Sequence, residues 1–166
     1  MNEMLRRDVL KLLTSALVAP ALLTYGCRSN TDPWGKTKLI RSNIKLPNIP
    51  QGDFVITTYG AVGDGQTDCT RAIADAIAAA SAVGGGRVVV PSGIFLTGPI
   101  HLESHIDLHV DVEATLSFIP EPERHLPAVF TRWEGVEFMG LSPLIYAYGK
   151  TDIAISGGGT LSGGAD

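Results

Sequence analysis

Two stretches of alternating apolar and polar residues, 100–118 and 145–162, constrain the fold of this chain more than any other feature. In the first stretch, Ile106, Leu108 and Val110 alternate with polar residues, which predicts strands with one buried face and one wet face. Apolar anchors recur every eight residues in both stretches. Evenly spaced short strands, with glycine turns and no helices between them, predict a solenoid of β coils.

The second stretch repeats the first when the sequence is shifted by 45 residues. This shift overlays Ile100 on Ile145, Leu108 on Ile153, Val110 on Ile155, and Thr115-Leu116-Ser117 on Thr160-Leu161-Ser162. Three strands of about eight residues make a coil of about two dozen residues. The shift therefore corresponds to two coils, or to one coil that carries the segment Ile119–Leu141 as an insertion. Three prolines interrupt this segment, so we expect an irregular loop outside the stack, where binding residues tend to lie.

An amphipathic helix is predicted over residues 70–83, because apolar side chains recur there at helical spacing. Its apolar stripe includes Ile73, Ile77 and Ala80. Thr67 or Asp68 can cap the start of the helix, and three glycines end it. Cys69 is expected to be a small buried residue. A single helix followed only by strands is expected to cover the exposed edge of the first coil.

Length and charge exclude several classes of protein. At 166 residues the chain holds one domain at most, with enough apolar content for a core. Its formal net charge of −4 provides no broad basic surface, so no nucleic-acid partner is expected. The two cysteines, Cys27 and Cys69, do not make a disulfide framework.

The N-terminus has the features of an export signal. Arg6 and Arg7 followed by an apolar run over residues 12–26 resemble a twin-arginine signal peptide, and the run is short for a membrane span. Cys27 follows a glycine, as in lipoprotein processing, although ordinary cleavage nearby is an equal alternative. We therefore expect an exported protein in the periplasm, on the outer membrane as a lipoprotein, or outside the cell. Membrane contact is expected only through a lipid on Cys27.

The expected organisation is a signal peptide at 1–26, a linker at 27–52 and a β domain at 53–166. The linker contains scattered prolines and has no sustained period. The domain begins with a short strand near Phe54.

Several polar groups have both a functional and a structural interpretation. Asp64 and Asp68 could bind a metal or phosphate, but a turn aspartate and a helix cap are favoured. Glycines 84–86 could cradle an anion, but they follow a helix and so favour a helix stop. His105 and His109 could ligate zinc from one strand face, yet the sequence fixes no third ligand. A solvated face is therefore favoured, and no metal site is expected.

Arg132, Trp133 and Glu134 are the best candidates for substrate binding. A tryptophan face can stack on a sugar ring, and an arginine fork matches a carboxylate. The alternative, which we slightly favour, is that Trp133 plugs the loop onto the coils with an Arg–Glu pair at its rim. Tyr146 and Tyr148 point the same way from their strand and have the same ambiguity. Tyr146 is included as a candidate binding residue.

The segment from Asp53 to Asp68, with the following helix and the run Gly84–Gly93, resembles the entry segment of the pectate-lyase-like superfamily. Arg132-Trp-Glu-Gly, Ser142-Pro-Leu-Ile-Tyr-Ala-Tyr and Asp152-Ile-Ala-Ile-Ser-Gly-Gly-Gly resemble bacterial polygalacturonases of glycoside hydrolase family 28. The resemblance covers residues 53–166. It implies an all-β, right-handed parallel β-helix with an N-terminal capping helix, truncated on its C-terminal side.

The resemblance also implies a function. The family hydrolyses α-1,4-galacturonosyl links in pectin with inversion, using aspartates in an Asn-Thr-Asp motif and an Asp-Asp pair, followed by Gly-His-Gly and Arg-Ile-Lys. Inversion needs two separated carboxyl groups with room for a water. The only match to these motifs is Asn30-Thr31-Asp32, which precedes the domain. No catalytic role therefore transfers to any residue, and the chain as given is expected to be inactive.

The expected partner is pectic polysaccharide, either polygalacturonate or rhamnogalacturonan, and no cofactor is expected. Two alternatives remain open. One is a non-catalytic β-helix module that binds acidic polysaccharide. The other is a β-eliminating, pectate-lyase-type enzyme, which calcium dependence and unsaturated products would reveal. Endo or exo action and plain or branched substrate are left open by the sequence.

Overall fold

The computed structural model describes residues 34–164, so the predicted signal peptide, Cys27 and the sequence Asn30-Thr31-Asp32 lie outside the described residues. The chain divides into two units, residues 1–45 and 46–166. The described part of the first unit contains helix α2 (Thr37–Asn43), which buries no residue and which the predicted linker did not anticipate. In the described range, no helix has both the length and the apolar character needed to cross a membrane.

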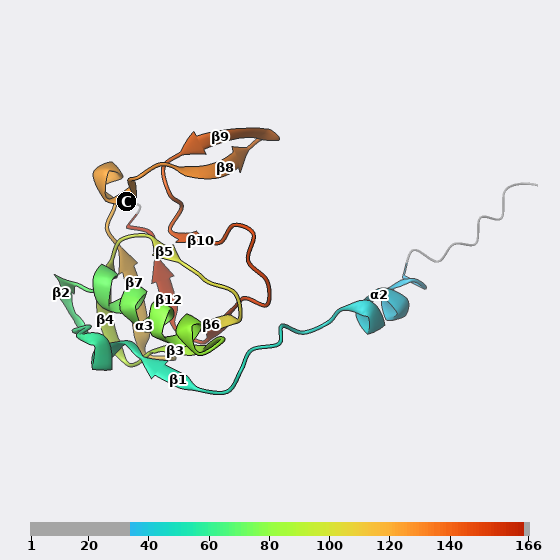
Figure 1. The fold of residues 1–166 in the computed structure, drawn as a ribbon, viewed down its shortest axis with the longest axis horizontal. Coiled ribbons are helices and arrows are strands. Elements are labelled where there is room, and N and C mark those ends of the chain that lie inside the picture. Colours follow the sequence, from blue (N-terminus) through green and yellow to red (C-terminus); the bar gives the residue numbers. More distant parts are fainter. Residues whose placement is uncertain (1–33, 165–166) are drawn as a thin grey trace, which may run out of the picture. The chain divides into compact units, whose positions relative to one another are not determined.

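The body of the second unit is built from short parallel strands that stack from coil to coil (Figure 1). One sheet has the order β1-β3-β6-β11, formed by β1 (Asp53–Val55), β3 (Gly86–Val90), β6 (Ile106–Val110) and β11 (Ala154–Gly157). A second has the order β12-β7-β4-β2, formed by β12 (Thr160–Ser162), β7 (Ala114–Phe118), β4 (Gly93–Thr97) and β2 (Asp64–Asp68). A third pairs β10 (Ile145–Tyr146) with β5 (Ile100–His101). The predicted right-handed parallel β-helix is confirmed.

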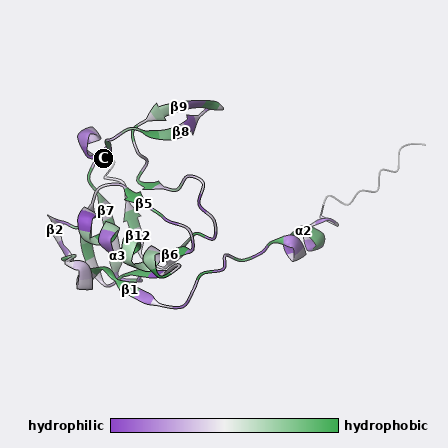
Figure 2. Ribbon diagram, in the orientation of Figure 1, coloured by the Kyte–Doolittle hydropathy of each residue, from purple (hydrophilic) through white to green (hydrophobic). Residues whose placement is uncertain are grey.

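Rows of apolar side chains run through the interior, because the strands of successive coils pair in register and place side chains at equivalent positions above one another. Val88 pairs with Leu108, and Phe95 pairs with Leu116, and all four are buried. The green strands in Figure 2 mark these rows. Parallel strands covered on their inner face read as apolar at every second position, which is the alternation seen in the sequence.

Helix α3 (Thr70–Ala82) covers the first coil, as predicted. Its buried face consists of Ala72, Ile73, Ala76, Ile77 and Ala80. The helix packs against β1, β3 and the 3-10 helix η1 (Ile56–Tyr59). It ends in a Schellman motif, in which Gly84 N–H bonds to Ser81 O at 3.0 Å and Gly85 N–H bonds to Ala80 O at 2.9 Å. The glycines are therefore the predicted helix stop.

The start of α3 differs slightly from the prediction. The N-cap residue is the buried Cys69, whose side chain does not cap the helix. Asp68 carries out the capping from one position earlier, since its Oδ1 accepts the Thr70 N–H at 2.9 Å. Cys69 instead places its Sγ near backbone oxygens, 3.2 Å from Thr67 O. Of the two predicted caps, Asp68 is thus the one used.

The segment before the helix, where Asp64 was expected as a turn aspartate, contains an edge strand, β2, which pairs with β4 with an irregular register. Within this irregular stretch, Asp64 Oδ1 accepts the N–H groups of Gln66 and Thr67 at 2.8 Å each, which is the hydrogen bonding of a turn. These backbone donors, first Thr67 and then Gln66, lower the pKa of Asp64 below its ordinary value of 3.8. The carboxylate therefore acts as a turn residue.

The sequence repeat corresponds to one coil, and the insertion lies between its two copies. The sequence shift between paired strands of the two copies is not constant. Strand β10 lies on β5, and β12 on β7, at the predicted shift of 45. Strand β11 lies on β6 at a shift of 47, so Ile155 pairs with Leu108 and the predicted overlays of Ile153 on Leu108 and Ile155 on Val110 are wrong. The corner before β11 is two residues longer than its counterpart, and the glycine corner after β11 is two residues shorter.

The insertion is more regular than predicted. It contains the 3-10 helix η2 (Pro122–His125) and an antiparallel hairpin of β8 (Val129–Trp133) and β9 (Val136–Gly140). Glu134 and Gly135 form the two-residue turn with φ of 48° and 89°. Two positive φ values match the twist of the flanking strands, as in type I′ turns. The predicted irregular loop is therefore a β-hairpin, which we call the insertion hairpin.

Candidate functional site

The insertion hairpin and the segment around strand β10 line an open pocket of about 420 Å³. Its lining residues are Phe130, Thr131, Arg132, Glu137, Pro143, Ile145, Tyr146, Ala147 and Tyr148. Cross-strand pairing in the hairpin places Arg132 opposite Glu137 and Phe130 opposite Met139. Residues two apart on a strand share a face, as do directly opposed residues. One face of the hairpin therefore carries both the Arg132 guanidinium and the Phe130 ring into the pocket.

Two tyrosines hold the hairpin against the coils through one residue, Phe130. The Tyr146 hydroxyl donates to Phe130 O at 2.8 Å. The Phe130 ring lies edge-on to Tyr148, with centroids 5.0 Å apart at 62°. The Tyr146 ring also lies 5.1 Å from that of His101. The pocket wall therefore includes an aromatic cluster of Phe130, Tyr146 and Tyr148.

The structure brings two of the four predicted binding residues into this pocket and leaves two outside it. Arg132 and Tyr146 line it, whereas Trp133 and Glu134 are at the hairpin turn and are not lining residues. Trp133 is 70% exposed, so it does not plug the loop onto the coils, and that interpretation is wrong. Within residues 34–164, the ion pairs do not include one between Arg132 and Glu134. Glu137 instead is opposite Arg132.

Sequence reasoning missed Phe130 and Glu137 as pocket residues. Alternation over residues 129–133 and 136–140 around a glycine-containing turn was the available signal. Glu-Gly is a less common I′ turn than Asn-Gly or Asp-Gly, and three nearby prolines suggested an irregular loop. Reading the two runs as paired strands would have placed Arg132 across from Glu137.

The arrangement suits binding of an anionic sugar better than acid–base chemistry. Arg132 offers a planar fork that matches a carboxylate, and the aromatic rings offer faces for a sugar ring. Glu137 is the carboxylate that lines the pocket. An inverting hydrolase needs two carboxyl groups on opposite sides of the bond that breaks. The pocket by itself therefore has the chemistry of recognition.

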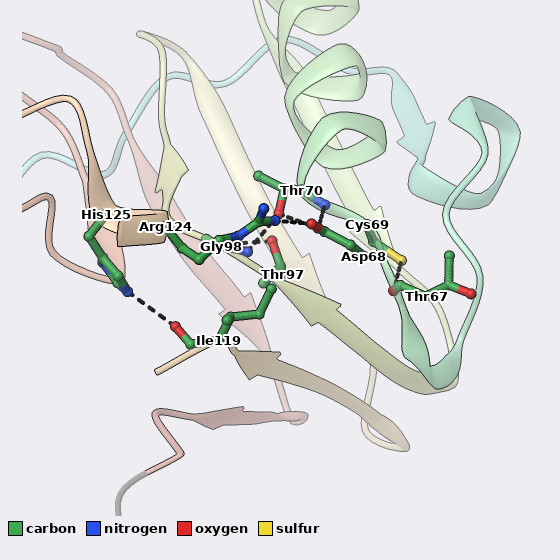
Figure 3. A network of polar contacts seen from close by, with 9 residues as sticks. All are labelled: Thr67, Asp68, Cys69, Thr70, Thr97, Gly98, Ile119, Arg124 and His125. Carbon is green, nitrogen blue, oxygen red and sulfur yellow. Dashed lines mark hydrogen bonds and ion pairs between the residues drawn. The ribbon is translucent and has the colours of Figure 1, made fainter. Parts of the chain in front are cut away.

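A polar network at the base of the insertion connects it to the first turn of α3 (Figure 3). Arg124, in η2, forms an ion pair with Asp68. The same carboxylate accepts the Thr70 N–H, and the Thr70 hydroxyl accepts the Gly98 N–H at 2.7 Å. Asp68 therefore joins the cap of the helix to the start of the insertion.

The next residue, His125, bridges the two ends of the insertion. Its Nδ1 is 2.7 Å from Ser142 O, and its Nε2 is 3.2 Å from Ile119 O. The Ser142 N–H returns a bond to His125 O at 3.0 Å. Ser142 is buried, and its hydroxyl lies 2.9 Å from Nε2 of His101 beside the pocket tyrosine. The insertion is thus closed at its base by side chain and backbone together.

A second polar cluster lies on the outer face of β3, β6 and β11. Asp107 accepts from Arg87 Nε at 3.0 Å and from the Ser156 hydroxyl at 2.7 Å. His109 Nδ1 lies 2.7 Å from the same Ser156 oxygen. These partners cover Asp107, which is only 5% exposed, so the prediction of a fully wet polar face is wrong at this residue. The neighbouring coils supply partners that a single strand's pattern cannot reveal.

The two histidines considered as zinc ligands do not share a strand face. His105 precedes β6 with φ of 62°, and its Nδ1 lies 3.0 Å from Asn48 O and 3.5 Å from Asp152 Oδ2. His109 is occupied with Ser156 on the strand itself. In the part of the chain that the structure describes, three or more His, Cys, Asp or Glu side chains are nowhere arranged to hold a metal ion.

Comparisons with known proteins give one family and several relatives. Residues 54–112 match the family described as rhamnogalacturonase A/epimerase, pectate lyase-like. A solved exopolygalacturonase from Thermotoga maritima is 49% identical with a TM-score of 0.75, over 78% of this chain and 29% of that chain. A Vitis vinifera protein named "Probable polygalacturonase" is 32% identical over 117 residues, which are 65% of this chain and 24% of the relative.

A further relative carries a different name. Plasmin and fibronectin-binding protein A of Streptococcus pneumoniae is 48% identical over 83 residues, which are 49% of this chain and 12% of the relative. The chain thus spans less than a third of the length of each of these three relatives.

Proposed function

Since this chain contains a pectate-lyase-like β-helix region of the glycoside hydrolase family 28 type, we propose that it belongs to a polygalacturonase-type enzyme acting on pectic polysaccharide. In this proposal, the pocket between the insertion hairpin and β10 binds a galacturonate unit of the polymer. The observation that carries it is the joint placement of Arg132 and Tyr146 in one aromatic pocket. Arg132 pairs with the sugar carboxylate, and an aromatic ring packs on the sugar face.

The proposal separates binding from hydrolysis. The sequence lacks an Asp-Asp pair, Gly-His-Gly and Arg-Ile-Lys, and its Asn30-Thr31-Asp32 precedes the β domain. An inverting reaction needs a general acid and a general base set apart by a water. We therefore expect the 166-residue chain to bind oligogalacturonate without cleaving it. Whether the substrate is polygalacturonate or rhamnogalacturonan is answered by comparing the two polymers in the same assay.

Calorimetric titration of the 166-residue chain with trigalacturonate tests the proposed binding. Arg132→Gln is expected to weaken binding about 10-fold or more, because a charge-assisted pair contributes about 1.5–3 kcal/mol. Glu137→Gln is expected to tighten binding, because it removes a negative charge that faces the sugar carboxylate. Arg71→Gln is the matched control, since it removes an exposed arginine from an ion pair on the helix.

Neutral galactotriose distinguishes recognition of the carboxylate from general sugar binding. It is expected to bind more weakly than trigalacturonate and to be insensitive to Arg132→Gln. Equal binding of trigalacturonate by the wild type, Arg132→Gln and Arg71→Gln would contradict the proposed site.

A second candidate function is a non-catalytic binding module. The pneumococcal relative, whose name describes binding to plasmin and fibronectin, favours this class. A reducing-end assay on polygalacturonate separates the two functions for a longer protein that contains this chain. Hydrolysis releases reducing ends without unsaturated products, a β-eliminating lyase releases both, and a binding module releases neither.

We also propose that the protein is exported, with Cys27 as the site of lipidation. The support is the sequence of the N-terminus, with Arg6 and Arg7 before an apolar run over residues 12–26, which Cys27 follows. Replacing both arginines by lysine is expected to retain the protein in the cytoplasm. Cys27→Ser is expected to abolish incorporation of labelled palmitate, and unchanged labelling would contradict the lipid anchor.

A further inference from the structure

The insertion Ile119–Leu141, which includes the insertion hairpin, contacts the coils at two separate places. One is beside the pocket, where Tyr146 and Tyr148 hold Phe130. The other is at the base, where Arg124 and His125 of η2 lie against the start of α3 and the two ends of the insertion. A hairpin of two strands is marginally stable on its own, so its orientation depends on these attachments.

Beside the contacts of His125, the base attachment includes one carboxylate that has two tasks. One oxygen of Asp68 accepts the Thr70 N–H and so caps α3, while the other oxygen forms the ion pair with Arg124 (Figure 3). Both side chains of the ion pair are about 40% exposed. Fifty-six residues separate the partners in sequence, so the contact ties the cap of the first coil to the insertion of a later one.

We propose that Asp68 and Arg124 are positioning residues that orient the insertion hairpin over β10 and thereby set the affinity of the pocket for an acidic sugar. This inference rests on the proposed function of the pocket. Neither residue lines the pocket, so neither contacts the sugar. Their effect comes through the fraction of molecules in which the hairpin lies in the binding orientation, because apparent affinity falls in proportion to that fraction.

The size of the effect follows from the exposure of the pair. Partly exposed ion pairs shift a two-state equilibrium by up to about fivefold. Loss of the pair is therefore expected to accelerate opening of the hairpin and to weaken trigalacturonate binding by about two- to fivefold. The β coils should keep their stability, since their apolar rows do not include either residue.

Three substitutions in the 166-residue chain test the proposal. Arg124→Gln removes the cation, Asp68→Asn removes the anion but keeps an oxygen for the Thr70 N–H, and the double variant removes both charges. Arg71→Gln is the matched control, because Arg71 pairs with Asp75 on the exposed face of the same helix. Hydrogen exchange of amides 129–140 without ligand measures hairpin opening, and calorimetry measures trigalacturonate affinity. Circular dichroism establishes that each variant is folded.

The expected result is faster exchange of the hairpin amides and weaker binding in both single variants, with the double variant no worse than either. Non-additivity of this kind is the signature of a direct pair. Arg124→Lys should restore part of both effects. The proposal is overturned if the hairpin amides of the Asp68 and Arg124 variants exchange no faster than those of Arg71→Gln. It is also overturned if their exchange is faster but trigalacturonate affinity is unchanged, because the ion pair would then be structural only. If the wild type binds no trigalacturonate, the proposed function fails; exchange alone then decides whether the pair orients the hairpin.

Discussion

The stacked coils and the insertion hairpin are both β structure, yet they are stabilised in different ways. In the coils, Leu108 is paired with the buried Val88 of the neighbouring coil. Parallel strands stack in register there, so their apolar side chains form continuous rows. In the hairpin, Trp133, Val136 and Met139 remain largely exposed, and attachment comes from Phe130 and from the base. The coils thus form a scaffold, and the hairpin supplies one wall of the pocket. The proposed recognition site thus lies on the less buried of these two regions.

Leu108→Ala is expected to cause the largest loss of stability, because it removes a side chain from the core of the coils. The side chain is 0% exposed, between Val88 and Ile155 in its row. Removing its buried methyl groups leaves a cavity and should lower the free energy of unfolding by about 2–5 kcal/mol. Urea denaturation followed by circular dichroism measures this change in the free energy of unfolding.

Trp133→Ala is the matched comparison, since it truncates a larger apolar side chain on the hairpin. Exposed substitutions usually change stability by less than about 0.5 kcal/mol. A loss comparable to that of Leu108→Ala would show that Trp133 is buried in solution and would remove the contrast between the two regions.

Gly135→Ala is expected to have an intermediate effect that stays within the hairpin. Gly135 has φ of 89°, where a Cβ is strained, although no atom lies within 4 Å of the position a Cβ would take. The cost should be about 1 kcal/mol. Hydrogen exchange should accelerate in residues 129–140 and remain unchanged in β3 and β6. Faster exchange throughout the coils would mean that the hairpin is part of the cooperative core.

Asp64→Asn should have the smallest effect, and that effect should depend on pH. The pKa of Asp64 is lowered by the N–H groups of Thr67 and Gln66, so the folded state favours the carboxylate. Its contribution to stability is present above the ordinary pKa of 3.8 and is lost as pH falls through the lower folded value. The stability difference between wild type and Asp64→Asn should therefore shrink below about pH 4. A difference that grows in acid would contradict this origin.

The coils could be predicted from sequence more fully than the hairpin. Alternation around Leu108 and the stripe of Ile73 and Ile77 are local patterns, and they gave the strands and the capping helix correctly. The register of β11 could not be predicted from the repeat. The corner before β11 is two residues longer than its counterpart and the corner after it is two residues shorter, so the overall shift of 45 between the two copies hides both changes.

The site was harder to predict because its contacts join distant segments. Arg132 and Tyr146 were recognised by residue type, while Glu137 required the hairpin register. The pair of Asp68 with Arg124 joins residues that no local pattern connects. Burial of Asp107 likewise depends on Arg87 and Ser156 from the neighbouring coils.

A chemical-shift titration of the isotope-labelled 166-residue chain with trigalacturonate tests the proposed site most directly. The perturbed amides are expected to cluster in residues 129–148, around Arg132 and Tyr146, while the buried rows of β3, β6 and β7 do not respond. Perturbations centred on the outer face of the coils, around His109 and Ser156, or no perturbation at saturating ligand, would contradict the claim that the insertion hairpin forms the sugar-binding site.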